Sequence, residues 1–473
     1  MVFRVVLIVW ENIQWVYVAA VKDAVAEQRD AKDTALSKLL FRRVHSRIDL
    51  KTPIENIKQN ALGQYQTFLD ENRSGLDEVA TSLSARFQRW AHQNAKINLD
   101  WIRGEKAISV APPAAEIKAT EGRFAGELAR FGHGLQRSFI FALLEELAQH
   151  AETGPLLILG CEEPELYQHP PQARYMASVL ERLSQQNSQV LICTHSPYFV
   201  SGRGFESIRI VLKDQGTGCS SVKQTTFEDV ANMIAAATGK KPDRTGGVAA
   251  KVEQEMQGQM NEMFFAYLRI FVEGLEDLAY ISSYISLMDR ADDFRALGCH
   301  IIQVQGKNHL IEALAISQQL GLPLFTVFDA DGDTPADTAE KSTGKRKQHE
   351  NENTAIFNLH HLKDVPAFPD ATLWTDNLVA WPTKIGDIVK TEFGEDNWQK
   401  IMQVVRAKYN NFCPDMAKNA LFLGYMMSEA WEQGVKSPSL IELCERILKY
   451  ARSQELGPPE SDQAPAATTV AVG

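Results

Sequence analysis

Three carboxylates alternate with other residues directly after an apolar run in the second half of the chain: Asp329, Asp331 and Asp333. The run itself, residues 324–328, has the length and composition of a short buried strand. Side chains two positions apart on an extended chain point the same way, about 7 Å apart, so these acids would gather at one strand end. Two carboxylates at about 4 Å repel by about 4 kcal/mol at an effective dielectric of about 20, which favours a bound cation. Oxygen ligands of this kind suit Mg²⁺ or Mn²⁺; the alternative is a polar turn in which Asp and Gly serve the turn geometry.

A second apolar run, residues 268–272, is followed by acids that would face the same point. Glu273 closes this predicted strand, and Gly274 turns the chain into a helix predicted over residues 275–288. Asp277 then lies in the first turn of that helix. Both acids can therefore point toward one site.

The order of the predicted elements in this region gives the fold class. A strand over residues 299–304 and a helix over residues 308–320 lie between the two acidic strand ends. Strand–helix–strand–helix–strand is typical of an α/β fold with a parallel sheet flanked by helices. Sites in such sheets form at the carboxyl ends of the strands, so we expect the acids of both strand ends to lie together.

Carboxylates also close a strand in the first half of the chain. An apolar strand is predicted over residues 155–160, and Glu162 and Glu163 follow it. A further strand, residues 189–193, runs into His195. On its own, His195 would be interpreted as a capped loop histidine.

Glycines precede a long apolar helix predicted over residues 139–149, in the stretch Gly132-His-Gly134-Leu-Gln136. Free backbone N–H groups and the helix dipole make such a start a good anion site. A single Gly-x-Gly is equally compatible with an ordinary turn. Strands are also expected over residues 98–108 and 114–120.

Composition excludes several classes of protein. The 473 residues carry 49 basic and 60 acidic side chains, a net charge of −11, which argues against a globally basic nucleic-acid coat. The six cysteines are scattered without a C-x-x-C pair, as expected for reduced thiols in a cytoplasmic protein without a zinc site. The apolar start, residues 1–10, is too short to span a membrane, and no longer apolar run follows, so no membrane association is expected.

Two motif sets resemble known domains. An acid after one strand with Asp-x-Asp after another resembles the TOPRIM pattern, and Glu-Glu-Pro-Glu…His-Pro with Thr-His-Ser-Pro resembles the second half of an ABC-class ATPase. This resemblance implies that Glu162 replaces the Asp that holds Mg²⁺ through water, and that Glu163 polarises the attacking water. It also implies that His195 senses the γ-phosphate of ATP and that a signature-like loop reaches the nucleotide across a dimer. The candidate residues of that loop are Gly132, Gly134 and Gln136.

An ABC-type ATPase part followed by TOPRIM resembles the OLD (overcoming lysogenisation defect) family of ATP-dependent nucleases, which includes Gabija-type nucleases. The resemblance implies an ATP-regulated DNA endonuclease whose TOPRIM site uses two divalent cations, Mg²⁺ or Mn²⁺, to hydrolyse phosphodiesters. The cation ligands carried over are Glu273, Asp277, Asp329, Asp331 and Asp333. The catalytic candidates are Glu273, Asp329, Asp331, Lys418 and Glu163. Lys418 is the candidate for a lysine that helps the transition state, whereas Lys307 is expected only to cap a helix.

The chain departs from the family at the phosphate-binding loop. A P-loop needs G-x-x-x-x-G-K-[S/T] to cradle phosphates, and the sequence has no such run. In the family this loop lies in a lobe that would precede Met1, so the sequence is expected to be truncated. Whether the chain binds ATP is therefore left open.

The expected domain organisation follows from these motifs. Residues 23–96 are a helical arm, either ordinary packed helices or a dimerisation element. The remaining segments are 1–22 and 97–215 (ATPase part), 216–265 (linker), 266–365 (TOPRIM core), 366–455 (helical part) and 456–473 (disordered tail). The expected partners are DNA, a second copy in a homodimer or higher oligomer, and an accessory helicase-type protein in phage defence.

Other functions remain open. An SMC-like or recombination-type ATPase that binds DNA would not need the TOPRIM acids. A topoisomerase needs a tyrosine nucleophile, but Tyr280 and Tyr284 fit the core of the helix after Glu273, and a primase would carry a zinc module. The last alternative is an inactive fragment that assembles with a partner carrying the missing lobe.

Overall fold

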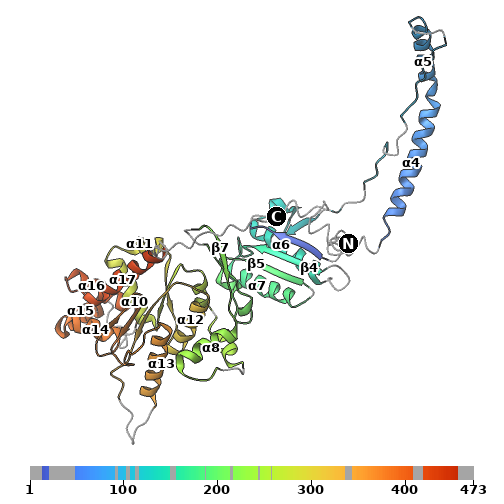
Figure 1. The fold of residues 1–473 in the computed structure, drawn as a ribbon. Coiled ribbons are helices and arrows are strands. Elements are labelled where there is room, and N and C mark those ends of the chain that lie inside the picture. The colour runs from blue at the N-terminus through green and yellow to red at the C-terminus, as the bar shows by residue number, and fades with distance from the viewer. Residues whose placement is uncertain are drawn as a thin grey trace. The chain divides into compact units, whose positions relative to one another are not determined.

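The computed structural model divides the chain into two compact units, Met1–Thr194 and His195–Gly473 (Figure 1). The structure describes residues 13–20, 48–90, 94–102, 107–111, 115, 117–149, 156–186, 188–213, 217–242, 246–256, 258–335, 344–408 and 419–455. No helix among these residues has both the length and the apolar character needed to cross a membrane.

A three-stranded parallel sheet forms the centre of the first unit. Its strands are β1 (Ile13–Val18), β4 (Leu156–Glu162) and β5 (Ser188–Cys193), with β4 in the middle. Val18 pairs with Cys161, and Glu162 pairs with Cys193, so all three strands end at one edge. The sequence predicts β4 and β5 because each contains an apolar run bounded by polar residues.

Helices and a hairpin complete the first unit. The helices are α6 (His133–Gln149) and α7 (Pro170–Ser184), and the hairpin pairs β2 (Lys118–Glu121) with β3 (Phe124–Glu127). The prediction of a strand over residues 98–108 is wrong, because the described residues of that range form no regular element.

Two further helices, α4 (Lys51–Glu71) and α5 (Arg73–Phe87), lie within the predicted helical arm. Leu69 is their one buried residue, whereas apolar side chains such as Phe68 and Val79 are exposed. Low burial of apolar residues favours an element that does not pack into the core of its own chain.

A five-stranded sheet forms the centre of the second unit, in the order β11-β12-β10-β8-β9. The strands are β8 (Leu268–Val272), β9 (Cys299–Gln303), β10 (Leu324–Asp329), β11 (Leu373–Trp374) and β12 (Leu378–Trp381). All neighbouring pairs are parallel except β11 with β12. The chain passes from β8 to β9 on one side and then to β10 on the other, so its direction of winding switches between β8 and β10. Such a switch point opens a crevice at the carboxyl ends of the two strands.

Helices cover both faces of this sheet. Ile270, Val272 and Val327 face a core shared with α10 (Leu275–Leu287), α14 (Ile385–Phe393), α15 (Glu395–Lys408), α16 (Ala420–Glu432) and α17 (Pro438–Glu455). Phe271 and Phe328 face a core shared with α8 (Phe227–Thr238), α9 (Gly247–Glu255), α12 (Lys307–Gln319) and α13 (Lys345–Leu359). Tyr280 and Tyr284 are each 1% exposed, in line with the core role expected for them.

Within residues 216–265, assigned to a linker from the sequence, the described residues form regular elements of the second unit. They contain β7 (Ser220–Lys223), which pairs with β6 (Ile210–Lys213), then α8, α9 and the 3-10 helix η6 (Gly258–Phe264). Val230 and Met263 in this segment are completely buried in the core around α12. Glycine, lysine and threonine clusters suggested a linker, but the apolar residues between them complete this core. The short helix α11 (Ala291–Ala296) lies between α10 and β9.

Candidate functional site

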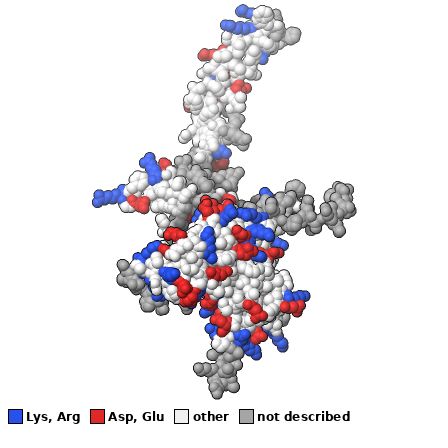
Figure 2. All heavy atoms as spheres, turned by 90° about the vertical axis from the view of Figure 1, so that its left-hand side faces the viewer, with Lys and Arg blue, Asp and Glu red and all other residues white. Residues whose placement is uncertain are grey.

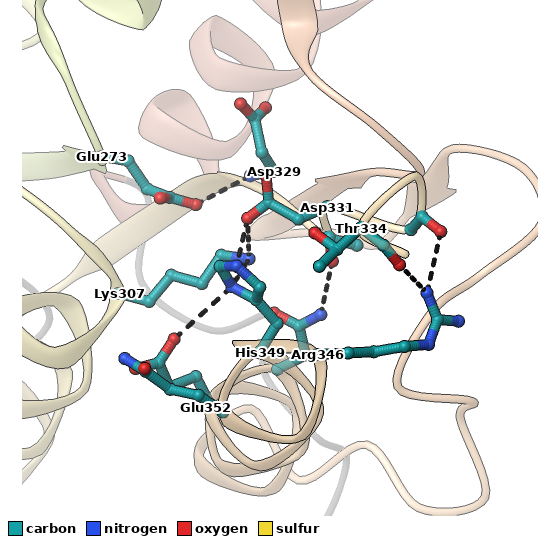
Figure 3. Close-up of polar contacts among 12 residues, drawn as sticks. Glu273, Lys307, Asp329, Asp331, Thr334, Arg346, His349 and Glu352 are labelled. Carbon is teal, nitrogen blue, oxygen red and sulfur yellow. Dashed lines mark hydrogen bonds and ion pairs between the residues drawn. The ribbon is translucent and has the colours of Figure 1, made fainter. Parts of the chain in front are cut away.

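Glu273 and Asp329 end the two adjacent strands at the switch point, as the sequence predicts. The Glu273 carboxylate accepts a hydrogen bond at Oε1 from the backbone N–H of Asp329, at 2.9 Å (Figure 3). Asp329 in turn accepts at Oδ1 from the N–H of Ile385, at 3.1 Å. Among the described residues, the second oxygens of both carboxylates have no hydrogen-bond donor. Two anchored carboxylates thus each retain one oxygen for a ligand.

Asp277 joins them from the first turn of α10. Its Oδ2 accepts a hydrogen bond from the backbone N–H of Gly274 at 2.9 Å, which caps the helix. The residue is 4% exposed, although a capping carboxylate usually contacts water. Burying a charged carboxylate is costly. The burial of Asp277 therefore indicates a role beyond capping the helix.

The surroundings of Glu273, Asp277 and Asp329 disfavour the charged form of each carboxyl. Burial, opposed in part by Lys307, raises the pKa of Glu273 to about 8. Burial likewise raises the pKa of Asp277 to about 7. Burial, followed by the charges of Asp277 and Glu273, raises the pKa of Asp329 well above its usual range. Carboxyls that retain protons near neutral pH lack a compensating cation.

Asp331 differs from the other acids because a lysine already neutralises it. The ammonium of Lys307 donates to Asp331 Oδ2 at 2.6 Å, and its side chain is 3% exposed (Figure 3). His349 Nδ1 lies 3.3 Å from the same oxygen. Burial and the charge of Lys307 lower the pKa of His349, so the lysine is the principal cation beside Asp331 at pH 7. The expectation that Lys307 only caps a helix is therefore wrong: it begins α12, but its side chain enters the site.

Side chains from α13 hold the loop that carries Asp331. Asn353 donates from Nδ2 to the Ala330 carbonyl at 2.8 Å, and Arg346 donates to the Gly332 carbonyl at 3.2 Å. Asp331 itself has φ 51°, a left-handed conformation that Asp tolerates better than most residues. This loop is therefore held by side chains that the sequence analysis did not identify.

Two further sequence candidates stand apart from this cluster. Asp333 is exposed on the turn after Asp331, where the alternation of the strand no longer applies. Lys418 lies outside the described residues. The prediction that Glu273, Asp277, Asp329 and Asp331 come from neighbouring elements at one sheet edge agrees with their positions.

A cavity of about 270 Å³ opens beside these acids, lined by Glu273, Lys307 and His349 among others. Within the described part of the chain, no three acidic, histidine or cysteine side chains stand close enough to coordinate one metal ion. The residues nevertheless fit a hard divalent cation in their chemistry: carboxylate oxygens, backbone-anchored and desolvated, with raised pKa values. To bind such a cation, these acidic side chains would have to rotate while the backbone of the strand ends stays in place.

In the first unit, Glu162 lies at the carboxyl end of β4. Its Oε2 accepts from the Tyr17 hydroxyl at 2.8 Å and from the Ala20 N–H at 3.3 Å. The Tyr17 hydrogen bond, followed by that of Ala20, lowers the pKa of Glu162. The protein's own donors therefore stabilise this carboxylate in its charged form.

Glu163 follows with φ 41°, and its N–H donates to the Cys193 carbonyl at 2.7 Å. Arg137 binds the same edge from α6: it donates to the carbonyls of Glu162 and Glu163, both at 2.8 Å, and to that of Ala20 at 2.9 Å. Arg137 is 4% exposed, so it holds the ends of β1 and β4 from inside. Arg137 directly follows Gln136, the last candidate residue of the signature-like loop.

The signature-like loop contributes backbone packing. Gln136 donates from Nε2 to the Phe131 carbonyl at 2.7 Å, and a Cβ at Gly134 would meet the Tyr167 carbonyl at 3.1 Å. Gly132 directly precedes α6. His195 is the first residue of the second unit.

Comparisons with known proteins place both regions. The family described as "AAA ATPase domain" matches residues 10–200, and "Overcoming lysogenization defect protein-like, TOPRIM domain" matches residues 264–331, which include the four clustered acids. The "OLD nuclease" of Thermus scotoductus is 25% identical over 226 residues, covering 46% of this chain and 39% of that protein. The "Old nuclease" of Escherichia phage P2 is 25% identical over 214 residues, covering 42% of this chain and 35% of that protein.

Among solved structures, the C-terminal region of the Xanthomonas campestris pv. campestris OLD protein aligns with a TM-score of 0.26 at 12% identity, over 41% of this chain and 98% of that one. The chain spans less than half the length of the curated relatives it matches, 39% and 35%. An AAA-type ATPase region is therefore followed in this chain by an OLD-like TOPRIM domain, and both curated relatives are OLD nucleases.

Proposed function

We propose that the chain is a divalent-metal-dependent DNA endonuclease whose reaction takes place at the carboxyl ends of β8 and β10. The observation that carries the proposal is the group of buried Asp277 and half-buried Glu273 and Asp329, whose pKa values are raised by burial. Its support is that the two curated relatives are named as OLD nucleases. Carboxyls that serve only the fold are rarely gathered away from water without a paired cation.

These three residues would hold an Mg²⁺ or Mn²⁺ ion. A bound cation supplies a Lewis acid and a water of lowered pKa for attack on a phosphodiester. The chain fixes the acids: backbone N–H groups hold one oxygen of Glu273 and of Asp329, and the α10 cap holds Asp277. The use of two cations, implied by the family resemblance, stays a prediction.

Regulation by ATP belongs to the first unit in this proposal. Glu162 and Glu163 at the end of β4 would serve the Mg²⁺ and the attacking water of ATP, and Arg137 fixes the backbone that carries them. The exposed apolar residues of α4 and α5 support a dimerisation element. Cytoplasmic location, an accessory helicase-type partner and phage defence remain parts of the same proposal.

A plasmid-nicking assay tests the proposal. The purified chain is incubated with supercoiled plasmid and Mg²⁺ or Mn²⁺, with and without ATP, beside D329A. The matched control is D292N, because Asp292 is fully exposed on α11, which precedes β9 and so lies at the amino ends of the strands. We expect nicking that needs metal, is lost in D329A and is kept in D292N. Folded protein that nicks with no metal, or a D329A variant as active as the parent, would refute the proposal.

A further inference from the structure

The four clustered acids fall into two electrostatic groups. Glu273, Asp277 and Asp329 have no ion pair within 4 Å to any described cation, although Asp277 is only 4% exposed. Asp331, by contrast, has the Lys307 ammonium at 2.6 Å. The charge of Asp331 is therefore already balanced within the chain, whereas no described cation pairs with the other three acids.

The position of Lys307 is built into the fold. Gln305 and Gly306 adopt positive φ values of 62° and 124°, which turn the chain after β9 so that α12 starts with this lysine at the edge where β8 and β10 end. Its ammonium lies 3.5 Å from His349 Nδ1 and 5.9 Å from the centre of the Phe328 ring. A lysine that is 3% exposed is costly to bury without an anionic partner, and Asp331 is that partner.

The Lys307 side chain also faces the cavity beside the acids. Glu273, Lys307 and His349 line the same space of about 270 Å³, so the ammonium and the Glu273 side chain border one ligand volume. A fixed ammonium at this place supplies positive charge to a phosphate bound in the cavity without any exchange with solvent.

We propose that the Lys307 ammonium takes the place of a second divalent cation, so that the site binds one divalent ion at Glu273, Asp277 and Asp329 and carries one fixed lysine charge at Asp331. The inference rests on the proposed nuclease site and replaces its expected two-cation arrangement by one cation and one lysine. Asp331 then serves to position the lysine and is not a ligand of the divalent ion.

Counting bound Mn²⁺ tests this inference without measuring activity. The full chain is titrated without nucleotide by calorimetry and equilibrium dialysis, and the double variant E273Q/D329N gives the background from other sites. We expect one Mn²⁺ per chain above this background, both in the parent and in D331N.

Any other number of Mn²⁺ ions bound per chain would contradict the inference. Two ions per chain, or a D331N variant that loses the ion, would overturn the inference and leave the nuclease proposal standing. No ion above background would remove the proposed metal site and the nuclease proposal with it.

Because D331N leaves Lys307 buried without its partner, the double variant K307M/D331N serves as the second test. This variant removes both charges together and retains an apolar side chain of similar length, so it keeps the fold even where D331N does not. We expect it to bind one Mn²⁺ with an affinity within about threefold of the parent. Loss of the ion in this folded variant would show that Asp331 or Lys307 belongs to the coordination shell and would refute the inference.

Discussion

Acidic side chains end parallel strands in both units, but their pKa values are shifted in opposite directions at the two sites. At the end of β4, hydrogen bonds from Tyr17 and Ala20 lower the pKa of Glu162. At the ends of β8 and β10, burial raises the pKa values of Glu273 and Asp329. The same topological position therefore gives one carboxylate that is stable as an anion and a group that is not.

The difference lies in where each strand end places its cationic side chain. In the first unit the cationic charge at the strand ends comes from Arg137, which binds backbone carbonyls and leaves the Glu162 side chain to other donors. In the second unit Lys307 pairs with Asp331 and leaves three acids without an ion pair to a described cation. Under the proposed function, a divalent ion would supply the positive charge that the chain itself does not place beside these three acids. On the face that Figure 2 shows, acidic and basic side chains are interspersed, in keeping with a net charge of −11.

The largest effect is expected in the first unit, for R137M. The substitution removes hydrogen bonds to the backbone carbonyls of Ala20, Glu162 and Glu163 at a residue that is 4% exposed. Loss of a buried charged partner typically costs about 3–5 kcal/mol, which denaturant unfolding of the first unit would measure. The control R182M changes an exposed pair with Glu145 and should stay within about 0.5 kcal/mol of the parent. Equal stabilities of R137M and R182M would show that Arg137 does not hold the strand ends.

Divalent cations should stabilise the second unit and leave the first unchanged. At a free Mg²⁺ concentration about 100 times its Kd, binding to the folded state alone adds about 2.7 kcal/mol. Thermal unfolding followed with EDTA and with Mg²⁺ would show this gain in the parent. A similar gain in E273Q/D329N would place the cation elsewhere.

The pH dependence of stability should have opposite signs at the two strand ends. Glu273 has a folded pKa of about 8, above that of an unfolded Glu, so the metal-free protein loses stability as pH rises from about 5 to about 8. E273Q removes this loss and should raise stability at pH 8.5 by about 1–3 kcal/mol, measured by denaturant unfolding in EDTA. E162Q is the matched comparison: the lowered pKa of Glu162 stabilises the protein above the unfolded pKa, and that contribution is lost as pH falls through the folded value. A parent whose stability rises between pH 5 and pH 8 and an E273Q variant that is destabilised would contradict the comparison.

The smallest effect is expected for Y17F. The variant removes the hydroxyl that donates to Glu162 at 2.8 Å, which is the main cause of the lowered pKa of that carboxylate. The pKa of Glu162 should rise toward its ordinary value with little change in stability, and a carboxyl-resolved NMR titration would measure it. An unchanged pKa would show that the backbone donor alone holds the charge.

Much of the second unit could be predicted from the sequence because its signals are local. Residues 268–272 and 324–328 are apolar runs that end in acids, and both form buried strands of a parallel sheet. The position of Asp277 in the first turn of α10 follows from the glycine turn after Glu273. Local patterning therefore suffices to bring the acids to one sheet edge.

The remaining features depend on contacts between distant segments. Lys307 enters the site only because β9 lies beside β8, and His349 and Asn353 arrive from α13, more than forty positions along the chain from it. A stretch Gln305-Gly306-Lys307 at the end of a predicted strand was the available signal for the lysine. Residues 216–265 were assigned to a linker from their glycine, lysine and threonine clusters, whereas their apolar residues find partners on distant elements that include α12 and α13.

The most direct test of the central claim is the number of protons released when Mn²⁺ binds, measured by calorimetry at pH 7 in buffers of different ionisation enthalpy. Because the pKa of Glu273 is about 8 and that of Asp277 about 7 in the metal-free protein, a bound cation should displace protons from these acids. We predict that more than one proton is released per ion in the parent and that this release is lost in E273Q/D329N. Binding without proton release, or release that persists in the double variant, would contradict the account.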